Sequence, residues 1–280
     1  MITDCRFNNE EISCCKHFGM VDSEYGTCFS FNSLQAQNLD SVQFVVNRTT
    51  GPGVLSFRLL YDAQVSIHSP EELSTNILDK ELRFDVMTNV ANFVTFMFST
   101  IGVDNDPLLQ FEDIDARRCR YNNEIPNEAL HTYKIYSYGA CQLARKLEKS
   151  FEHCRCVHPV RDLNYKNLYC NYTGLNCLTT YEALKTKINK DVIDEDCLPS
   201  CNENDISTIY ISKKWIKMDL KETLVNIKMA TLPTLRYKKN LIRTNMDLVV
   251  SVGGLLGLFF SASILSLAEV FYLLLRKPNK

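Results

Sequence analysis

The chain has 280 residues, of which 31 are Lys or Arg and 33 are Asp or Glu, so its formal net charge is −2. A nucleic-acid-binding protein normally carries a basic excess, and the near-neutral balance argues against that class. The 45% content of hydrophobic residues is ordinary for a folded protein and excludes a disordered or fibrous chain. Twelve cysteines indicate either an oxidising compartment or metal sites.

The first hundred residues are expected to form mainly strands and turns. Gly51-Pro52-Gly53 is a strong turn signal between two apolar runs, 42–46 and 54–59. Further strands are expected over residues 65–68, 90–98 and 224–229.

The apolar period changes between residues 136 and 151. Leu143, Leu147 and Phe151 recur every four residues with charged residues between them, which predicts an amphipathic helix. A second, shorter helix is expected over 180–188.

The C-terminal region is strongly apolar. Residues 248–268 form a run of 21 residues without a charge, and residues 270–275 continue it after Glu269. At about 1.5 Å per residue such a helix crosses a hydrocarbon core of about 30 Å. We therefore expect an extracellular domain over 1–245, a transmembrane helix over 246–275 and a cytoplasmic tail over 276–280.

Small residues and one carboxylate interrupt this apolar segment. Gly253, Gly257 and Ser261 recur every four residues, a stripe that lets helices approach closely. Glu269 either faces a bundle interior or water, or snorkels to the headgroups, where Arg276 and Lys277 could neutralise it. The helix alone does not decide between these two interpretations.

Several features bear on orientation. Arg276, Lys277 and Lys280 favour a cytoplasmic C-terminus, although basic residues also precede the segment. All the cysteines lie before it, and Asn47 and Asn171 begin glycosylation sequons, as an outer-side domain would have. The first residues do not form a signal peptide, so we expect a further membrane segment upstream or, alternatively, insertion as a tail anchor.

The cysteine pattern is compatible with a metal site or with disulfides. Cysteines 154 and 156, with His153 and His158 beside them, invite a zinc interpretation. Their C-x-C spacing is not that of the common knuckle, and Cys197 and Cys201 lie far along the chain. With an apolar span and sequons present, disulfides are favoured and no metal is expected.

Sequence motifs of enzymes are absent. The chain has no G-x-S-x-G, H-E-x-x-H or P-loop motif, and its five histidines form no recognisable catalytic set. We therefore expect a protein that is not an enzyme.

Two blocks of sequence resemble a known family. The run from Gly253 to Glu269, GGLLGLFFSASILSLAE, resembles the second transmembrane helix of degenerin/epithelial sodium channels. The block that contains Cys5, the Cys14-Cys15 pair and residues 26–32 also resembles this family, and the double cysteine is similar to its insect pickpocket branch. The similarity runs from the family's finger region onward, so the family's first transmembrane helix and first extracellular strand are not matched.

The resemblance implies a fold and a set of disulfides. The fold is an α+β cysteine-rich extracellular domain, with a β-sheet palm and finger and a disulfide-stapled helical thumb, followed by one transmembrane helix, in a trimer. The implied thumb pairs are Cys119–Cys201, Cys141–Cys197, Cys154–Cys177 and Cys156–Cys170. Cys5 should pair with Cys14 or Cys15, and Cys28 is unpaired or joined to the spare member of that doublet.

One disulfide of the family's thumb ladder is missing. Its two positions fall at Arg145 and Glu195, where opposite charges replace both cysteines. The hypothesis is an ion pair in place of the disulfide, and the alternative is two independent solvated charges. A surface pair of this kind is worth only about 0–1 kcal/mol.

The resemblance also assigns a pore. Its selectivity filter falls on Ser261, Ala262 and Ser263, where backbone carbonyls and hydroxyls would replace the water shell of permeating Na⁺. Residues that line or pack the pore would be Gly253, Gly254, Gly257 and Glu269. Val250 falls near the family position at which bulky side chains favour open channels.

The expected function is that of a subunit of a voltage-independent, amiloride-sensitive-type sodium channel. It would lie in the plasma membrane of sensory or epithelial cells, in contact with lipid, and would form a homo- or heterotrimer with related subunits. No cofactor and no nucleic-acid partner are expected. The alternative is a non-conducting accessory or ligand-binding subunit. A secreted cysteine-rich factor would conflict with the apolar segment.

Overall fold

The computed structural model describes residues 1–36, 43–126, 133–158, 168–188, 197–215, 222–241, 245–260 and 264–275. The chain divides into two compact units, one formed by residues 1–105 and 112–238 and the other by residues 106–111 and 239–280. The strands are β1 Ile2–Phe7, β2 Glu10–Glu11, β3 Phe18–Ser23, β4 Gly26–Phe31, β5 Val54–Leu59, β6 Ala63–Ser66, β7 Arg83–Val86, β8 Phe93–Asn105, β9 Asp205–Lys214, β10 Thr223–Met229 and β11 Arg236–Lys239. The helices are α1 Cys14–His17, η1 Lys80–Leu82, η2 Pro107–Phe111, α2 Ile114–Arg117, α3 Tyr138–Cys154, α4 Tyr172–Ile188, α5 Asn245–Phe260 and α6 Ile264–Leu275.

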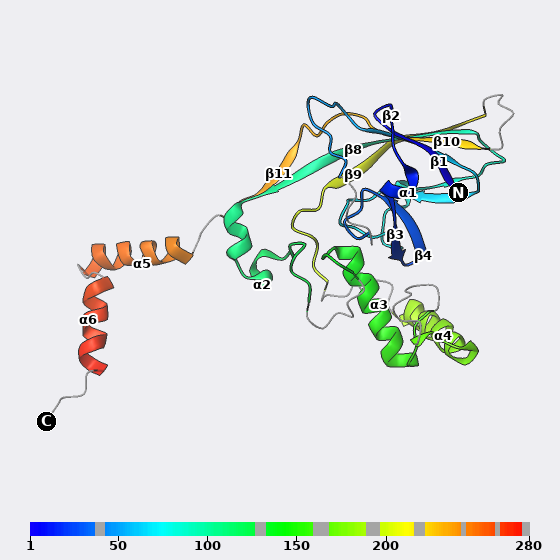
Figure 1. Cartoon of the computed structure of the whole chain (residues 1–280). Coiled ribbons are helices and arrows are strands. Elements are labelled where there is room, and N and C mark those ends of the chain that lie inside the picture. The colour runs from blue at the N-terminus through cyan, green and yellow to red at the C-terminus, as the bar shows by residue number, and fades with distance from the viewer. Residues whose placement is uncertain are drawn as a thin grey trace. The chain divides into compact units, whose positions relative to one another are not determined.

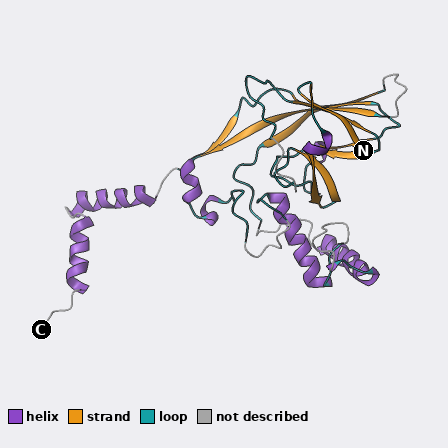
Figure 2. Cartoon of the chain, in the orientation of Figure 1, coloured by secondary structure: helices purple, strands orange, loops and turns teal. Residues whose placement is uncertain are grey.

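A seven-stranded mixed sheet, counted over the described residues, organises the first unit (Figures 1 and 2). Six of its strands follow the order β11-β8-β10-β5-β1-β2, and the seventh strand, β9, also pairs with β8. β10 runs parallel to β8 and antiparallel to β5, which joins segments about 170 residues apart in sequence. In β5 every second side chain is buried, at Leu55, Phe57 and Leu59. This alternation places one face of the sheet on an apolar core, because successive side chains of a strand point to opposite faces.

Two small hairpins accompany this sheet. β3 pairs with β4, and β6 pairs with β7, both antiparallel. Val21 of β3 belongs to the apolar cluster of α3, whereas Phe18 of β3 and Phe84 of β7 contact or belong to the cluster of the large sheet. The β3–β4 pair therefore contacts both parts of the core, and the β6–β7 pair contacts the sheet cluster.

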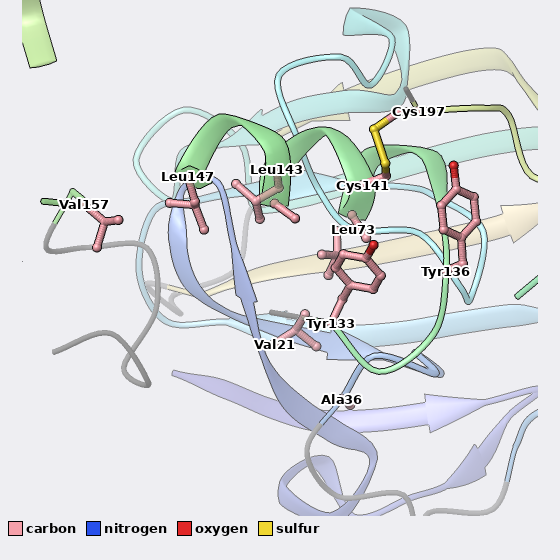
Figure 3. Packing of buried hydrophobic residues seen from close by; sticks show 12 residues of the cluster. Val21, Ala36, Leu73, Tyr133, Tyr136, Cys141, Leu143, Leu147, Val157 and Cys197 are labelled. Carbon is pink, nitrogen blue, oxygen red and sulfur yellow. A yellow bond between two sulfur atoms is a disulfide. The ribbon is translucent and has the colours of Figure 1, made fainter. Parts of the chain in front are cut away.

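The predicted amphipathic helix is confirmed as α3. Ser137 caps its N-terminus by accepting a hydrogen bond from Ala140 N (3.2 Å), and Arg155 ends it in the left-handed conformation. Leu143 and Leu147 project from one side of α3 and are 5% and 2% exposed (Figure 3). Their period of four puts them on one face of the helix.

Five disulfides join the described cysteines. Four lie in and around α3 and α4, which we call the thumb, and are the pairs implied by the family resemblance: Cys119–Cys201, Cys141–Cys197, Cys154–Cys177 and Cys156–Cys170. The fifth disulfide is Cys5–Cys14, so of the two expected partners of Cys5 the first member of the doublet, Cys14, is the one that forms the bond. Cys15 and Cys28 are free thiols.

The strand predictions are partly right. The runs 54–59 and 224–229 are confirmed as β5 and β10. The expected strand over 42–46 is wrong for residues 43–46, which form a loop, while residue 42 lies outside the described residues. In that loop Phe44 N donates a hydrogen bond to the side chain of Asn32 (3.0 Å), and the Phe44 ring packs on Phe7. A side-chain hydrogen bond and an aromatic contact thus take the place of the backbone hydrogen bonds that a β-strand would form.

The C-terminal residues form α5 and α6, of 16 and 12 residues, rather than a single described helix over 246–275. Within the described residues no helix is both long enough and apolar enough to cross a membrane. A helix needs about 20 residues to span a hydrocarbon core, and each of these two helices alone is shorter. The transmembrane assignment therefore stays a prediction.

Candidate functional site

The predicted pore residues are distributed over α5 and α6. Val250 and the three glycines, Gly253, Gly254 and Gly257, lie in α5, and Glu269 lies in α6. The predicted filter residues, Ser261 to Ser263, lie outside the described residues. The predicted flanking residues therefore lie in helices, and both their role in a pore and the filter itself stay predictions.

The two C-terminal helices expose much of their apolar surface. Leu258 of α5 is 79% exposed, and Leu265 of α6 is 81% exposed. A methyl group added at Gly254 would meet no atom within 4 Å. Such surface normally marks contact with a partner or a membrane, because monomeric soluble proteins seldom expose large contiguous apolar patches.

A buried junction joins the thumb to the loop that follows β6. The carboxylate of Glu72 accepts hydrogen bonds from the Ser137 hydroxyl (2.9 Å) and from Gly139 N (3.2 Å), at the first turn of α3. The partial positive charge of a helix N-terminus favours a carboxylate there. Sequence reasoning missed this contact, because 65 to 67 residues separate the partners and no local motif announces it.

Gly139 is the residue that makes room for Glu72. A Cβ at this position would overlap Glu72 Oε1 and would lie 3.2 Å from Thr75 Oγ1. Gly139→Ala should lower the free energy of unfolding by about 1–2 kcal/mol, since displacement of the carboxylate removes the hydrogen bonds to the helix N-terminus. The sign is opposite to the usual gain of about 1 kcal/mol for Gly→Ala within a helix.

Thermal and denaturant unfolding of the disulfide-intact chain measure this effect. Gly102→Ala in β8 is the control, because the nearest atom to an added Cβ, Arg236 Cγ, would lie at an ordinary contact distance of 3.5 Å, and no comparable loss of stability is expected. In a Glu72→Ala background the Gly139→Ala change should cost nothing, since the displaced carboxylate is already gone. An equal loss in both backgrounds would contradict the assignment.

A second contact joins the β3–β4 hairpin to the thumb. Lys146 Nζ on α3 lies 2.8 Å from Glu24 Oε1, whose side chain is 8% exposed. The other oxygen of Glu24 accepts a hydrogen bond from Asn76 N (2.8 Å). Glu24 thus links the hairpin turn both to the thumb and to the loop that follows β6.

Carboxylates also surround a cavity near the N-terminus of α3. Its walls include Glu72 and Tyr138, together with Glu203 from the segment between the thumb and β9, and Asp205, the first residue of β9. Burial raises the pKa of Glu203 to about 7, and the negative charges of Glu72, Glu71 and Asp205 add to that rise. Glu203 is therefore a carboxyl that takes up a proton near neutral pH.

This shift predicts a pH dependence of stability. The pKa of Glu203 in the folded chain lies above its ordinary value of 4.5, so its contribution to stability is complete below that value and is lost as the pH rises through about 7. The melting temperature of the parent chain should fall between pH 5 and pH 8. This fall should be larger than the fall in the melting temperature of a Glu203→Gln variant over the same pH range. The difference should be small, because the cavity shields Glu203 only in part, and water that reaches the rest of this side chain screens its charge. Parallel melting curves against pH for the two chains would contradict it.

The positions of the missing disulfide are only partly described. Arg145 Nη1 lies 2.8 Å from Glu148 Oε2, one turn along α3, while Glu195 lies outside the described residues. The ion pair proposed to replace the disulfide therefore stays a prediction.

Both sequon asparagines are exposed. Asn47 Oδ1 accepts hydrogen bonds from Thr49 Oγ1 (2.6 Å) and Thr50 N (2.8 Å), and Asn171 Oδ1 accepts one from Gly174 N (2.9 Å). Their glycosylation also stays a prediction.

Comparison with known proteins identifies the family. The family model for the amiloride-sensitive sodium channel matches residues 1–273. Similar proteins are sodium channel protein Nach of Drosophila melanogaster (21% identical, 99% of this chain and 58% of the relative), degenerin del-1 of Caenorhabditis elegans (24%, 99% and 44%) and pickpocket protein 19 of Drosophila melanogaster (22%, 96% and 58%). The chain thus spans about half the length of these relatives. The match over nearly all of its residues shows that the chain belongs to the amiloride-sensitive sodium channel family, whose members are ion channels and not enzymes.

Proposed function

We propose that this chain is a subunit of a voltage-independent, amiloride-sensitive-type channel that conducts Na⁺ across the plasma membrane. The observation that carries the proposal is that the family match extends through residue 273 and so includes the apolar C-terminal segment. The exposed apolar side chains of α5 and α6 support it, since they require a lipid or protein partner.

The proposed mechanism assigns a role to each part of the segment. Three copies would bring residues 261–263 together around the permeation path, where carbonyl and hydroxyl oxygens would replace part of the water shell of Na⁺. Gly253 and Gly257 would let the helices approach closely. Glu269 would lie below the filter in the permeation path, where a carboxylate attracts cations.

The proposed role of the extracellular domain follows from its cross-links. The Glu72 contact holds the first turn of α3 against the loop that follows β6, and the Cys141–Cys197 disulfide holds α3 to the segment that precedes β9. A rigid thumb of this kind would transmit a stimulus to the pore as a unit rather than absorb it.

Whole-cell current measurement tests the proposal. The chain would be expressed with the first transmembrane helix of a relative joined upstream, and Na⁺ outside would then be exchanged for an impermeant cation. A Na⁺-dependent inward current that amiloride blocks and voltage does not gate is expected. The chain would be expressed both by itself and together with a related subunit, and its presence at the cell surface would be verified in each case. If neither expression gives a Na⁺ current, conduction is contradicted and an accessory or ligand-binding role is favoured.

A further inference from the structure

The short 3₁₀-helix η2 presents an apolar face. Leu108 is 51% exposed and Phe111 is 78% exposed, whereas Leu109 is only 4% exposed. A 3₁₀-helix has about three residues per turn, so side chains three positions apart project from the same side. Leu108 and Phe111 therefore form one exposed apolar face, while Leu109 is covered by the rest of the protein.

η2 is fixed beside the strand that leads to the C-terminal helices. Asp106 N donates a hydrogen bond to Lys239 O (3.0 Å), and Asp106 Oδ1 accepts one from Leu108 N (2.9 Å). Lys239 ends β11, and α5 begins at Asn245. The chain between these two residues spans at most about 20 Å even when it is fully extended. The apolar face of η2 is therefore held within this reach of the start of α5, and both belong to the same compact unit.

The first turn of α5 is also apolar and exposed. Met246 is 71% exposed and Leu248 is 59% exposed. In the function proposed above, α5 belongs to the membrane segment, so the bilayer surface lies near this turn. The headgroup region extends the bilayer by about 5–8 Å beyond each side of the hydrocarbon core, which brings it toward η2. Apolar and aromatic side chains are suited to the boundary between headgroups and acyl chains.

We propose that η2 is a membrane-contact site, at which Leu108 and Phe111 enter the headgroup region of the bilayer beside α5. This inference rests on the proposed function, because it takes α5 as part of the membrane segment. The partner is a zwitterionic lipid surface such as phosphatidylcholine. The sequence of η2 contains no Lys or Arg, and Glu112 and Asp113 follow it, so apolar contact rather than attraction to anionic lipid holds it there.

The contact would couple the lipid surface to the large sheet. η2 begins two residues after the end of β8, at Pro107. β8 in turn pairs with β9, β10 and β11. A displacement of the bilayer at η2 would therefore reach the centre of the sheet by a path separate from the connection between β11 and α5.

Tryptophan fluorescence of the full chain in phosphatidylcholine bilayers tests the proposal. Trp215 is the single tryptophan of the sequence, so Phe111→Trp is introduced in a Trp215→Phe background. The chain is reconstituted with its disulfides intact, once in plain lipid and once in lipid brominated near the headgroup end of its acyl chains. Because bromine quenches the fluorescence of a tryptophan that it contacts, Phe111→Trp should lose fluorescence in the brominated bilayer. Its melting temperature shows that the variant is folded.

Two further positions complete the design. Leu258→Trp, in the same Trp215→Phe background, reports on α5 itself and should be quenched most by lipid brominated near the methyl end of its acyl chains. Trp215 in the parent chain is the matched control. It is 59% exposed and follows Lys214, which pairs with Phe93 at the start of β8, whereas η2 follows the end of that strand. About 40 Å of strand thus lies between Trp215 and η2, and Trp215 should keep its fluorescence.

The outcomes separate this inference from the proposed function. Quenching of Leu258→Trp without quenching of Phe111→Trp would overturn the contact at η2 and leave the membrane segment in place. If Leu258→Trp is not quenched in either brominated lipid, the membrane segment is contradicted, and the contact at η2 is overturned with it. Equal quenching of Trp215 and Phe111→Trp would also overturn the proposal, because contact with lipid would then not be confined to η2.

Discussion

Replacement of both Cys119 and Cys201 by Ala should lower the free energy of unfolding by about 3–4 kcal/mol, since the nested Cys141–Cys197 disulfide stays in place and shortens the loop that is released. The Cys119–Cys201 disulfide has the largest sequence separation of the five, 82 residues, and both of its cysteines are at most 5% exposed. A cross-link over a long loop removes more conformational entropy from the unfolded chain than one over a short loop. The backbone beside it is also paired, since Arg120 N donates to Pro199 O (3.0 Å) and Cys201 N donates to Arg120 O (2.8 Å).

The disulfide between Cys156 and Cys170 provides the control. Its sequence separation is 14 residues, so its removal should cost about 3 kcal/mol, less than removal of the long-loop disulfide. Urea unfolding of the parent and of the two double variants, each with the other disulfides verified by mass, measures the difference. An equal or reversed order would show that the loop-entropy account does not describe this thumb.

The second large effect is expected at a buried arginine. The side chain of Arg117 is 1% exposed, forms an ion pair with Glu124 and lies over the ring of Tyr121. Glu124→Gln should lower the free energy of unfolding by about 3 kcal/mol, because it leaves a buried positive charge without its carboxylate partner. Simultaneous Arg117→Met and Glu124→Leu should recover most of this loss, since an apolar pair carries no uncompensated charge. If the double variant is less stable than Glu124→Gln, this explanation is wrong.

The same pair predicts acid sensitivity. Partial burial raises the pKa of Glu124, but hydrogen bonds from Arg117 and from Tyr121 N and the charges of Arg117 and Arg120 outweigh it, so the net pKa is lowered. Its stabilising contribution is present above the ordinary value of 4.5 and is lost as the pH falls through the lower folded value. The parent chain should therefore lose more stability than Glu124→Gln as the pH falls below about 4.5.

Local patterns explain which parts of the fold could be predicted. The four-residue apolar period locates α3, because it reflects one buried face that Leu143 and Leu147 occupy. The alternation over residues 54–59 locates β5 for the same reason. The thumb disulfides followed from family resemblance alone, since spacing does not determine which of many pairings forms.

The parts that could not be predicted depend on contacts between distant segments. The contact of Glu72 with Ser137, the pairing of Glu24 with Lys146 and the acidic cavity each join residues far apart in sequence. β9 was missed because an irregularity at Ile209 shifts its register, and the adjacent apolar side chains of Ile209 and Tyr210 are both exposed, so the sequence does not show the alternation of a half-buried strand. The 43–46 loop has strand-forming residues, but Phe44 makes aromatic and side-chain contacts instead.

The proposed role of the C-terminal segment is to line a Na⁺ pore. Its most direct test is modification of Ser263→Cys by a charged thiol reagent during whole-cell recording, in a chain whose free Cys15 and Cys28 are replaced by Ser and which carries a relative's first transmembrane helix upstream. The reagent should reduce the Na⁺ current of Ser263→Cys and leave that of the same chain with Ser263 unchanged. A full Na⁺ current from Ser263→Cys after complete modification at that cysteine would contradict the claim.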